Sequence, residues 1–144
     1  NIPSGRQLHR GGTYLAMEGP AFSTRAESNL YRRWGCSIIG MTNHTEARLA
    51  REAEIAYASL SMVTDYDCWH QGHEEVCVDM ILENLNINTK VANKIVYETA
   101  KKIDLDRPKS SAHYALQQGL ITNKDKVSEK TKSKVKILTD KYWL

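Results

Sequence analysis

The chain has 144 residues, of which 41% are hydrophobic and 26% charged, a composition typical of a soluble globular domain with a core. No apolar run approaches the roughly 20 residues that a membrane-spanning helix needs, so we expect no membrane partner. The start of the chain lacks the basic and apolar regions of a signal peptide, and the three cysteines show no disulfide spacing. A reducing, cytoplasmic location is therefore expected.

The net charge of +3 is unevenly distributed, because residues 104–144 carry nine Lys or Arg and five Asp or Glu. A basic tail can indicate nucleic-acid binding. Here the lysines alternate with apolar residues, as on the solvent face of an amphipathic helix, and no RNA-binding motif accompanies them. We therefore predict a solvated helical tail and no nucleic-acid partner. The apolar residues that alternate with the lysines from Lys124 to Lys136 are Val127, Val135, Ile137 and Leu138.

The first predicted element is a strand within residues 11–19, where β-favouring side chains are bracketed by glycines. A helix follows it. Ser23 or Thr24 can cap the N-terminus of this helix, and Glu27 is placed to complete a capping box with Thr24. Gly35 is expected to end the helix.

Two further apolar runs are predicted to be strands, with a helix between them. Residues 36–41 have the length and β-branching of a buried strand, and Thr45 can cap the helix that follows. The run 55–64 is almost continuously apolar, as in a strand covered on both faces. Alternating strands and helices predict an α/β fold, in which ligands bind at the carboxyl ends of the strands.

The rest of the chain is predicted to be helical. One helix is expected over residues 74–85 and a second over residues 89–103. Pro108 marks a linker, so we divide the chain into a main body, residues 1–103, and a linker with a helical tail of the same domain, residues 104–144. The helix over residues 74–85 is expected to bury Val76, Met80 and Ile81.

Two carboxylates, Asp65 and Asp67, stand directly after the third predicted strand, where burial without a partner is costly. An aminopurine offers matching donors, namely its exocyclic amine and a ring nitrogen that carries a proton. A protonated Asp could also pass its proton to a leaving purine. From the spacing alone, a pair of capping or ion-paired aspartates is the more common explanation.

Polar segments also follow the other two predicted strands. Phe22, the only Phe of the chain, is either a platform for base stacking or a core residue. Ser23 lies at the start of a helix, where anions are favoured. Thr42 and the polar residues after it could bind a phosphate or a sugar, although Thr45 is explained as a helix cap and His44 as a surface residue.

Taken together and in this order, these segments resemble the methylthioadenosine phosphorylase branch of the purine nucleoside phosphorylase family. The resemblance covers about residues 5–103. It implies the C-terminal part of a phosphorylase/hydrolase-like fold, with a mixed central sheet flanked by helices. The segments that carry it are Gly11-Gly12-Thr13-Tyr14, residues 17–28, Gly40-Met41-Thr42, Tyr57-Ala58-Ser59 and Thr64-Asp65-Tyr66-Asp67-Cys68-Trp69.

The resemblance implies a pentosyltransferase that cleaves 5′-methylthioadenosine with phosphate, giving adenine and 5-methylthioribose 1-phosphate, in purine and methionine salvage. It also implies a homotrimer with no cofactor, inorganic phosphate being the co-substrate. Asp65, as the catalytic residue, and Asp67 would bind the purine N7 and 6-amino group. Phe22 would line the base pocket, with Ser23 beside it.

The same resemblance assigns the sugar and phosphate contacts. Met41 would contact the ribose and Thr42 the phosphate. Val78 and Ile81 would receive the methylthio group, and their apolar side chains favour a thioether over a 5′-hydroxyl. Branches that use 6-oxopurines have Asn at the position of Asp65, so Asp favours a 6-aminopurine.

The sequence departs from the family pattern at two places. Thr45 precedes Glu46 where many relatives have Pro, which leaves the loop less rigid. The family's Gly-rich loop, Arg-His-Gly segment and small-residue turn, which bind phosphate and lie upstream, are absent from this chain. The chain is therefore either a fragment or a protein that has lost half of its phosphate site.

Three alternatives stay open. The substrate could be another purine nucleoside or methylthioinosine. The chain could be an inactive fragment that acts only as a binding or oligomerisation module, with or without RNA. A metal hydrolase is the third, but the ligand spacing matches no standard zinc pattern, so no metal site is expected. The residues that would bind such a metal are Asp65, Asp67, His70, His73 and Glu74.

Overall fold

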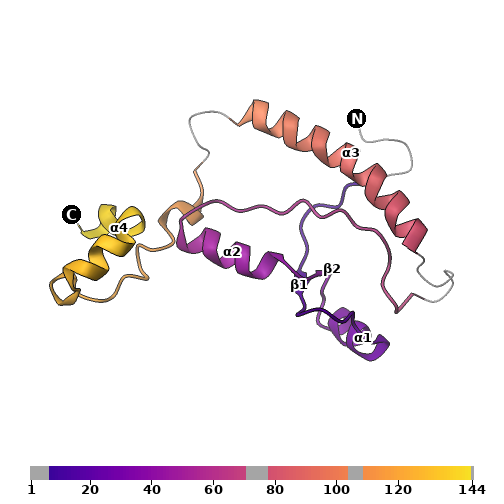
Figure 1. The fold of residues 1–144 in the computed structure, drawn as a ribbon, viewed down its shortest axis with the longest axis horizontal. Helices are drawn as coiled ribbons and strands as arrows, with labels where there is room; N and C mark the ends of the chain where they lie inside the picture. Colours follow the sequence, from indigo (N-terminus) through magenta and orange to yellow (C-terminus); the bar gives the residue numbers. More distant parts are fainter. Residues whose placement is uncertain (1–6, 71–77, 104–108, 144) are drawn as a thin grey trace. The chain divides into compact units, whose positions relative to one another are not determined.

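The computed structural model describes residues 7–70, 78–103 and 109–143. Figure 1 traces the order of its elements along the chain. The chain forms two compact units, one made of residues 1–42 and 59–105 and the other of residues 43–58 and 106–144. None of the described helices is both long and apolar enough to cross a lipid bilayer. The division at residue 103 that we predicted stays a prediction.

A small parallel sheet organises the first unit. Strand β1 (Tyr14–Ala16) pairs with β2 (Ile38–Gly40), with Tyr14 opposite Ile38. The pairing continues past the strand ends, because the Met17 N–H donates to the Gly40 carbonyl over 2.8 Å. Helix α1 connects the two strands, which Figure 1 shows side by side. Both strands were predicted, but the paired part of each is only three residues long.

Gly40 is required by the side chain that lies over it. A Cβ at this position would clash with the hydroxyl oxygen of Tyr14 and lie 2.7 Å from its Cζ. The substitution Gly40→Ala is therefore expected to displace the Tyr14 ring and destabilise the first unit by about 1–3 kcal/mol, as overpacking does. Urea unfolding followed by tryptophan fluorescence measures this loss.

The control for this prediction is Gly119→Ala, because a Cβ there meets its neighbours at ordinary distances of 3.6–4.0 Å. Replacing Tyr14 by Leu in the Gly40→Ala background should recover part of the stability. A Gly40→Ala variant as stable as the parent would contradict the steric role of Gly40.

Helix α1 (Arg25–Arg33) begins and ends as its sequence predicts. Thr24 is the N-cap, and the capping box with Glu27 is complete: the Glu27 N–H donates to Thr24 Oγ1 and the Thr24 N–H donates to Glu27 Oε2. The N–H and then the hydroxyl of Thr24 lower the pKa of Glu27. Gly35 follows the C-cap with φ of 79°, a conformation that favours glycine. Of the two predicted caps, Ser23 is excluded.

The third predicted strand is wrong for this structure. Residues 55–64 pair with neither β1 nor β2 and belong to no strand. Their apolar side chains are exposed; Ile55 is 57% and Val63 55% accessible to solvent. A continuous apolar run predicts a strand that other elements cover, and no described element covers both faces of this one. The segment 55–64 therefore has the composition of a buried strand, but no described element covers both of its faces.

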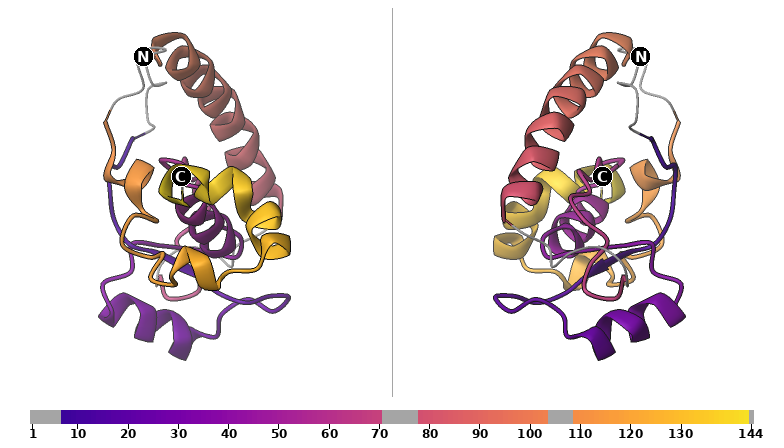
Figure 2. Two further views of the ribbon diagram at one scale, coloured as in Figure 1. Left: turned by 90° about the vertical axis from the view of Figure 1, so that its left-hand side faces the viewer. Right: turned by 90° about the vertical axis from the view of Figure 1, so that its right-hand side faces the viewer.

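The two helices predicted after residue 74 are one helix, α3 (Val78–Lys102), which Figure 2 shows as an unbroken rod. Thr89 was expected to start the second helix. Instead, its hydroxyl donates to the Leu85 carbonyl over 2.8 Å, a bond within a continuous helix. Met80 and Ile81 are half-buried as expected, whereas Val76 lies outside the described residues.

The second unit combines α2 (Asn43–Glu52) with two short 3-10 helices, η1 (Ser111–Tyr114) and η2 (Lys124–Lys126), and α4 (Glu129–Trp143). Helix α2 begins two residues before Thr45, so Thr45 lies in its first turn and is not its cap. Thr42, Asn43 and Thr45 are all suited to capping, so the sequence could not select one.

Helix α4 confirms the amphipathic tail, but one residue is misplaced in the prediction. Val135 and Leu138 are half-buried, as an inward face requires, and most of the lysines of the helix are exposed. Ile137, expected to share the inward face, is 94% exposed. Its neighbour Leu138 occupies the inward position, and consecutive residues of a helix point about 100° apart.

A carboxylate joins the two sequence segments of the second unit. Glu54, whose side chain is 8% exposed, pairs with Lys141 and accepts hydrogen bonds from the Tyr142 hydroxyl and the Leu116 N–H. Burial acts to raise the pKa of Glu54, but the hydrogen bonds outweigh it and lower the pKa to about 2. Lys141 also donates to the His113 carbonyl over 3.0 Å. Glu54 thus binds α4 and the segment that follows η1.

The lowered pKa of Glu54 makes the second unit acid-sensitive. A carboxyl group whose pKa is about 2 in the folded chain and 4.5 ordinarily contributes stability above pH 4.5 and loses it as the pH falls towards 2. We expect the parent chain to be more stable than Glu54→Gln at pH 6, and this difference to shrink between pH 5 and pH 2. Urea unfolding at several pH values, monitored by circular dichroism, measures it; a difference independent of pH would contradict the role of the charge.

Candidate functional site

Asp65 and Asp67, the two residues predicted to bind the purine, lie in a tight turn. Both oxygens of the Asp65 carboxylate are hydrogen-bonded, one to the Thr64 hydroxyl at 2.7 Å and the other to the Asp67 N–H at 2.8 Å. Asp67 has φ of 63°, so the chain turns at this residue instead of continuing as a strand. The turn directs the carboxylates differently: Asp65 bonds to the turn itself, and Asp67 bonds to α1.

Asp67 connects the turn to the most buried side chain of the described chain. Ser28, in the middle of α1, is 2% exposed, and its hydroxyl donates to Asp67 Oδ2 over 2.6 Å. The other carboxylate oxygen accepts the Cys68 N–H at 2.8 Å. These donors offset the cost of burying the carboxylate. A carboxylate oxygen accepts more than one hydrogen bond, so both aspartates keep acceptor capacity for a ligand.

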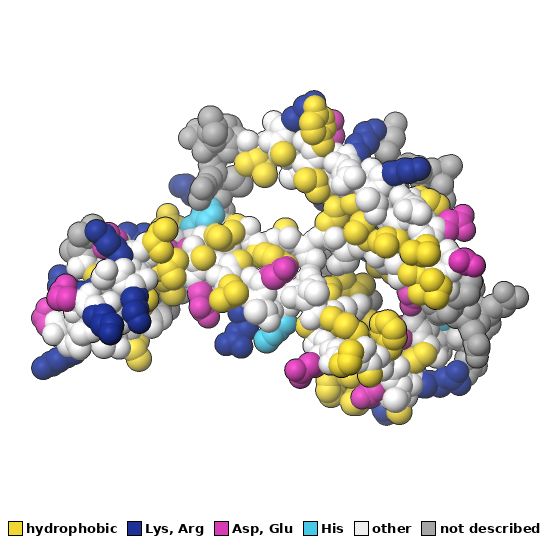
Figure 3. Space-filling model, in the orientation of Figure 1, with side chains coloured by type: hydrophobic (Ala, Val, Ile, Leu, Met, Phe, Trp, Pro, Cys, Tyr) yellow, Lys and Arg dark blue, Asp and Glu magenta, His cyan; other side chains and the backbone are white. Residues whose placement is uncertain are grey.

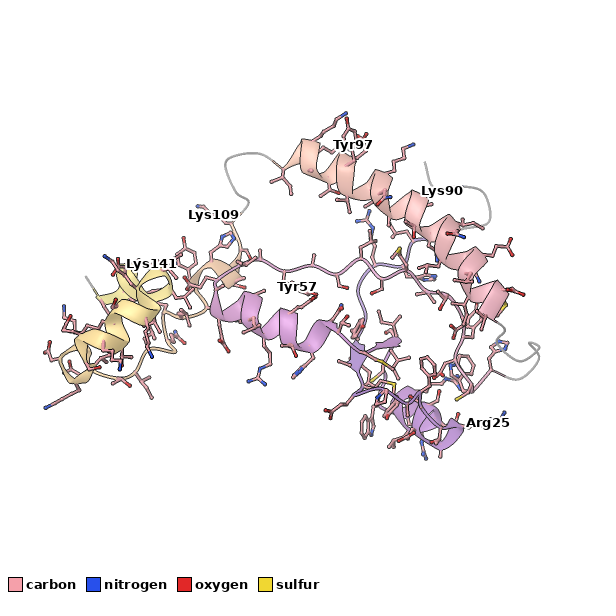
Figure 4. The ribbon with its side chains drawn as sticks, in the orientation of Figure 1. Arg25, Tyr57, Lys90, Tyr97, Lys109 and Lys141 are labelled. Carbon is pink, nitrogen blue, oxygen red and sulfur yellow. The ribbon has the colours of Figure 1, made fainter. Side chains whose placement is uncertain are left out.

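Two further contacts join the turn to the start of α1. Arg25 Nε donates to the Cys68 carbonyl over 3.3 Å, and the Cys68 thiol donates to the Ser23 carbonyl over 3.5 Å. Figure 4 labels Arg25 at this end of α1. Burial, followed by the charge of Asp67, raises the pKa of the Cys68 thiol, so it stays a donor at neutral pH. The structure therefore places Ser23 next to the turn that contains Asp67.

Met41 packs against the backbone of the Met17–Ser23 segment. A Cβ at Gly19 would lie 3.0 Å from Met41 Sδ, so the absence of a side chain at Gly19 leaves room for the thioether. The Ser23 hydroxyl donates to Met17 Sδ over 3.3 Å. Met41 is 40% exposed. Met41, which was predicted to contact the ribose, and Ser23, which was predicted to lie beside the base, thus both lie against the segment 17–19.

Phe22 and Thr42 lie at the exposed edge of this region. Phe22 is 86% exposed, which rules out its alternative assignment to a core and leaves its ring open to a partner. Thr42 lies two residues after the end of β2 and is exposed. None of the carboxylate hydrogen bonds described above involves either residue. Phe22 and Thr42 thus follow β1 and β2 along the chain, outside the hydrogen bonds that hold the two aspartates.

Helix α3 holds the segment that leads into the turn. Asn84 Nδ2 donates to the Thr64 carbonyl over 2.9 Å, and Asn88 Nδ2 donates to the Val63 carbonyl over 2.8 Å. Ile81 is half-buried, one helical turn before Asn84 on the same side of α3, whereas Val78 is 69% exposed. The position of Ile81 fits a wall near the turn, and that of Val78 shows no such contact in the described chain.

Sequence reasoning missed the residues that position the aspartates. Ser28 is the last residue of the segment 17–28 that carries the family resemblance, but a serine within a helix gives no signal of its own. Asn84 and Asn88 did carry a signal. Their spacing of four residues places two amides on one side of a helix, beside apolar residues, where a polar side chain needs a partner.

An aromatic cluster fixes the other end of the turn. The Arg32 guanidinium lies 3.6 Å from the centroid of the Trp69 ring, a cation–π contact between α1 and the turn. Tyr66 and His70 stack with 4.9 Å between ring centroids. In the described ranges, no three His, Cys, Asp or Glu side chains are grouped so that they could hold a metal. His73 and Glu74, which the metal alternative also requires, lie outside those ranges.

Comparison with known proteins identifies relatives of this chain. A family model described as the phosphorylase superfamily matches residues 3–101. The S-methyl-5′-thioadenosine phosphorylase of Prochlorococcus marinus is 67% identical over 142 residues, which are 99% of this chain and 45% of that protein. The protein of the same name from Thermosynechococcus vestitus is 58% identical over 135 residues, 94% of this chain and 47% of its own length. The chain thus spans about half the length of the relatives it matches.

Solved structures give the same result. A methylthioadenosine phosphorylase from an antarctic soil metagenomic library matches with a TM-score of 0.80 and 47% identity, covering 88% of this chain and 44% of its own. The methylthioadenosine phosphorylase of Schistosoma mansoni in complex with adenine matches with a TM-score of 0.67 and 34% identity, covering 81% and 41%. These matches confirm the predicted resemblance and the phosphorylase-like α/β fold.

Proposed function

This chain belongs to the phosphorylase superfamily, and we propose that it forms the purine-recognising part of a methylthioadenosine phosphorylase. The observation that carries the proposal is the Asp65–Asp67 turn, whose two carboxylates are anchored to α1 and α3 with acceptor capacity left for a ligand. An enzyme of this kind cleaves 5′-methylthioadenosine with phosphate. The products are adenine and 5-methylthioribose 1-phosphate.

The base would be recognised through its donors. Asp65 and Asp67 would bind N7, once protonated, and the 6-amino group, with Phe22 stacking on the ring and Ser23 beside it. The Schistosoma mansoni relative was solved in complex with adenine, which supports adenine as the base. Negative charge develops on the departing purine, and a proton held between Asp65 and N7 stabilises that charge in the transition state.

The sugar and phosphate would be held by the neighbouring loops. Met41 would contact the ribose, Thr42 one oxygen of the phosphate, and Ile81 with Val78 the methylthio group. Phosphate attacks C1′ as the bond to N9 breaks, so no protein nucleophile is needed. The remaining phosphate ligands would come from the part of the superfamily fold that this chain does not span. We further propose a cytoplasmic homotrimer serving purine and methionine salvage, without a cofactor.

Binding and turnover test this function separately. Equilibrium dialysis with adenine and with hypoxanthine measures whether the purified chain prefers the 6-aminopurine. Phosphate-dependent release of adenine from methylthioadenosine, followed by chromatography, measures the reaction. Adenine binding without release indicates a chain that recognises the base and lacks part of the phosphate site. A chain that binds neither purine and releases no adenine would contradict the proposal.

A further inference from the structure

Helix α3 has a half-buried side on which two asparagines lie among apolar residues. The residues of this side recur at spacings of three and four, and Figure 3 shows that hydrophobic side chains also run along the visible face of the helix. Asparagine is a weak helix former, and at a half-buried position its amide needs a hydrogen-bond partner. The two asparagines are therefore to be explained by what their amides bind. The residues of the half-buried side are Ile81, Asn84, Asn88, Val91 and Ile95.

Both amides bind the backbone of the segment that leads into the Asp65–Asp67 turn. Asn84 Nδ2 donates to the Thr64 carbonyl over 2.9 Å, and Asn88 Nδ2 donates to the Val63 carbonyl over 2.8 Å. We call Asn84 and Asn88 the amide pair. A single hydrogen bond would let the segment pivot about it, whereas bonds to successive carbonyls fix both its position along α3 and its direction. The two donors lie one helical turn apart on the same side of the helix.

Thr64 connects the amide pair to the carboxylate of Asp65. While the Thr64 carbonyl accepts from Asn84, the Thr64 hydroxyl donates to Asp65 Oδ2 over 2.7 Å. Asp65 Oδ1 accepts the Asp67 N–H over 2.8 Å. A carboxylate held at both oxygens has its remaining lone pairs in set directions, so a displacement of Thr64 would turn those lone pairs away from a ligand. The direction in which Asp65 accepts further hydrogen bonds thus depends on Asn84.

We propose that the amide pair consists of positioning residues for base selection. The pair fixes Thr64, and through Thr64 it directs the remaining acceptor capacity of Asp65 towards the donors of a 6-aminopurine. The inference rests on the proposed function, because it takes Asp65 to be the residue that binds the purine. A hydrogen bond needs a separation of about 3 Å and good alignment, and it weakens steeply away from that geometry. The 6-oxo group of hypoxanthine is an acceptor and gains nothing from a carboxylate, so its binding depends less on the direction of Asp65.

Purine selectivity tests this role. Asn84→Leu keeps a side chain of similar size and favours the helix, but it removes the donor. We expect the affinity for adenine to fall about three- to tenfold, the range of one net hydrogen bond, and the affinity for hypoxanthine to change by less than about twofold. Equilibrium dialysis of each purine against the full chain measures both affinities. A loss of folded protein would lower the two affinities alike, so their ratio reports positioning and is insensitive to stability.

Matched variants show whether the effect passes through Thr64. Asn86→Leu makes the same substitution at an exposed asparagine of α3 and should change neither affinity by more than about twofold. Thr64→Val removes the hydroxyl that binds Asp65, so Asn84→Leu should alter the selectivity less in that background than in the parent. An equal effect of Asn84→Leu in both backgrounds, or an equal loss of both purines, would overturn the inference.

Hydrogen exchange without a ligand separates this inference from the proposed function. The Asp67 N–H reports the position of Asp65, because it donates to Asp65 Oδ1. In Asn84→Leu its exchange, followed by NMR, should be about three- to tenfold faster. The Trp34 N–H, which donates to the Leu30 carbonyl at the end of α1, should exchange at its parent rate. Unchanged exchange at Asp67 overturns the inference even if the parent chain binds adenine. A parent chain that binds no adenine contradicts the proposed function even if exchange at Asp67 responds.

Discussion

Replacing Asp65 by Asn is expected to lower adenine affinity about 10–100-fold and to reduce the preference for adenine over hypoxanthine. The parent carboxylate only accepts hydrogen bonds unless it is protonated, so it matches the donors of a 6-aminopurine; an amide both accepts and donates and therefore serves an oxo edge as well. A hydrogen bond to a charged group contributes about 1.5–3 kcal/mol, which corresponds to this range of affinity.

Equilibrium dialysis of both purines against the parent and the variant measures the change. The matched control is Asp79→Asn, which makes the same substitution at an exposed position on the polar side of α3. The variant must also be shown to keep the turn, because Asp65 accepts the Thr64 hydroxyl and the Asp67 N–H. An amide oxygen can accept one of these bonds but not both, so unfolding of the parent and variant is compared first. Unchanged affinity and preference would remove Asp65 from base recognition.

Replacing Ser28 by Ala is expected to destabilise the first unit by about 1–3 kcal/mol, because the half-buried Asp67 carboxylate loses its hydroxyl donor. Ser28 is 2% exposed, so water has little access to replace the missing hydrogen bond. The effect should extend to adenine binding, because Asp67 is then free to leave the position that α1 imposes on it.

A double-mutant cycle assigns the energy to the Ser28–Asp67 pair. Ser28→Ala, Asp67→Asn and the double variant are unfolded in urea, and the coupling energy is the difference between the double variant and the two single ones. Ser61→Ala, at an exposed serine, is the control. Additive single effects would mean that the hydrogen bond contributes nothing, and the stability loss would then come from packing alone.

Local signals explain what was predicted correctly. The capping box of Thr24 and Glu27 and the end of α1 at Gly35 involve residues close together in the sequence, so α1 was predicted to its ends. The amphipathic pattern of α4 was predicted for the same reason, apart from Ile137. At Thr89 the local signal misled, because this residue was predicted to start a second helix, whereas its hydroxyl hydrogen-bonds within one continuous helix.

The candidate site also contains some features that the sequence predicted and others that only the folded chain shows. The positions of Asp65, Asp67 and Met41 at the ends of apolar runs were visible in the sequence. The partner of Asp67 was not, because Ser28 lies 39 residues earlier and only folding brings the two together. The left-handed conformation of Asp67 separates the directions of the two carboxylates, and nothing in the spacing of the aspartates predicts it.

The amino-acid sequence by itself determined the family, the βαβ order of the first residues and the chemical types available to a purine site. These depend on residue identity and on spacings within a few turns. The tertiary structure alone decided that α3 is one helix, that Ser28 holds Asp67, and that residues 55–64 lie exposed. Whether a segment is buried depends on which elements pack against it. The composition of an apolar run does not specify those contacts.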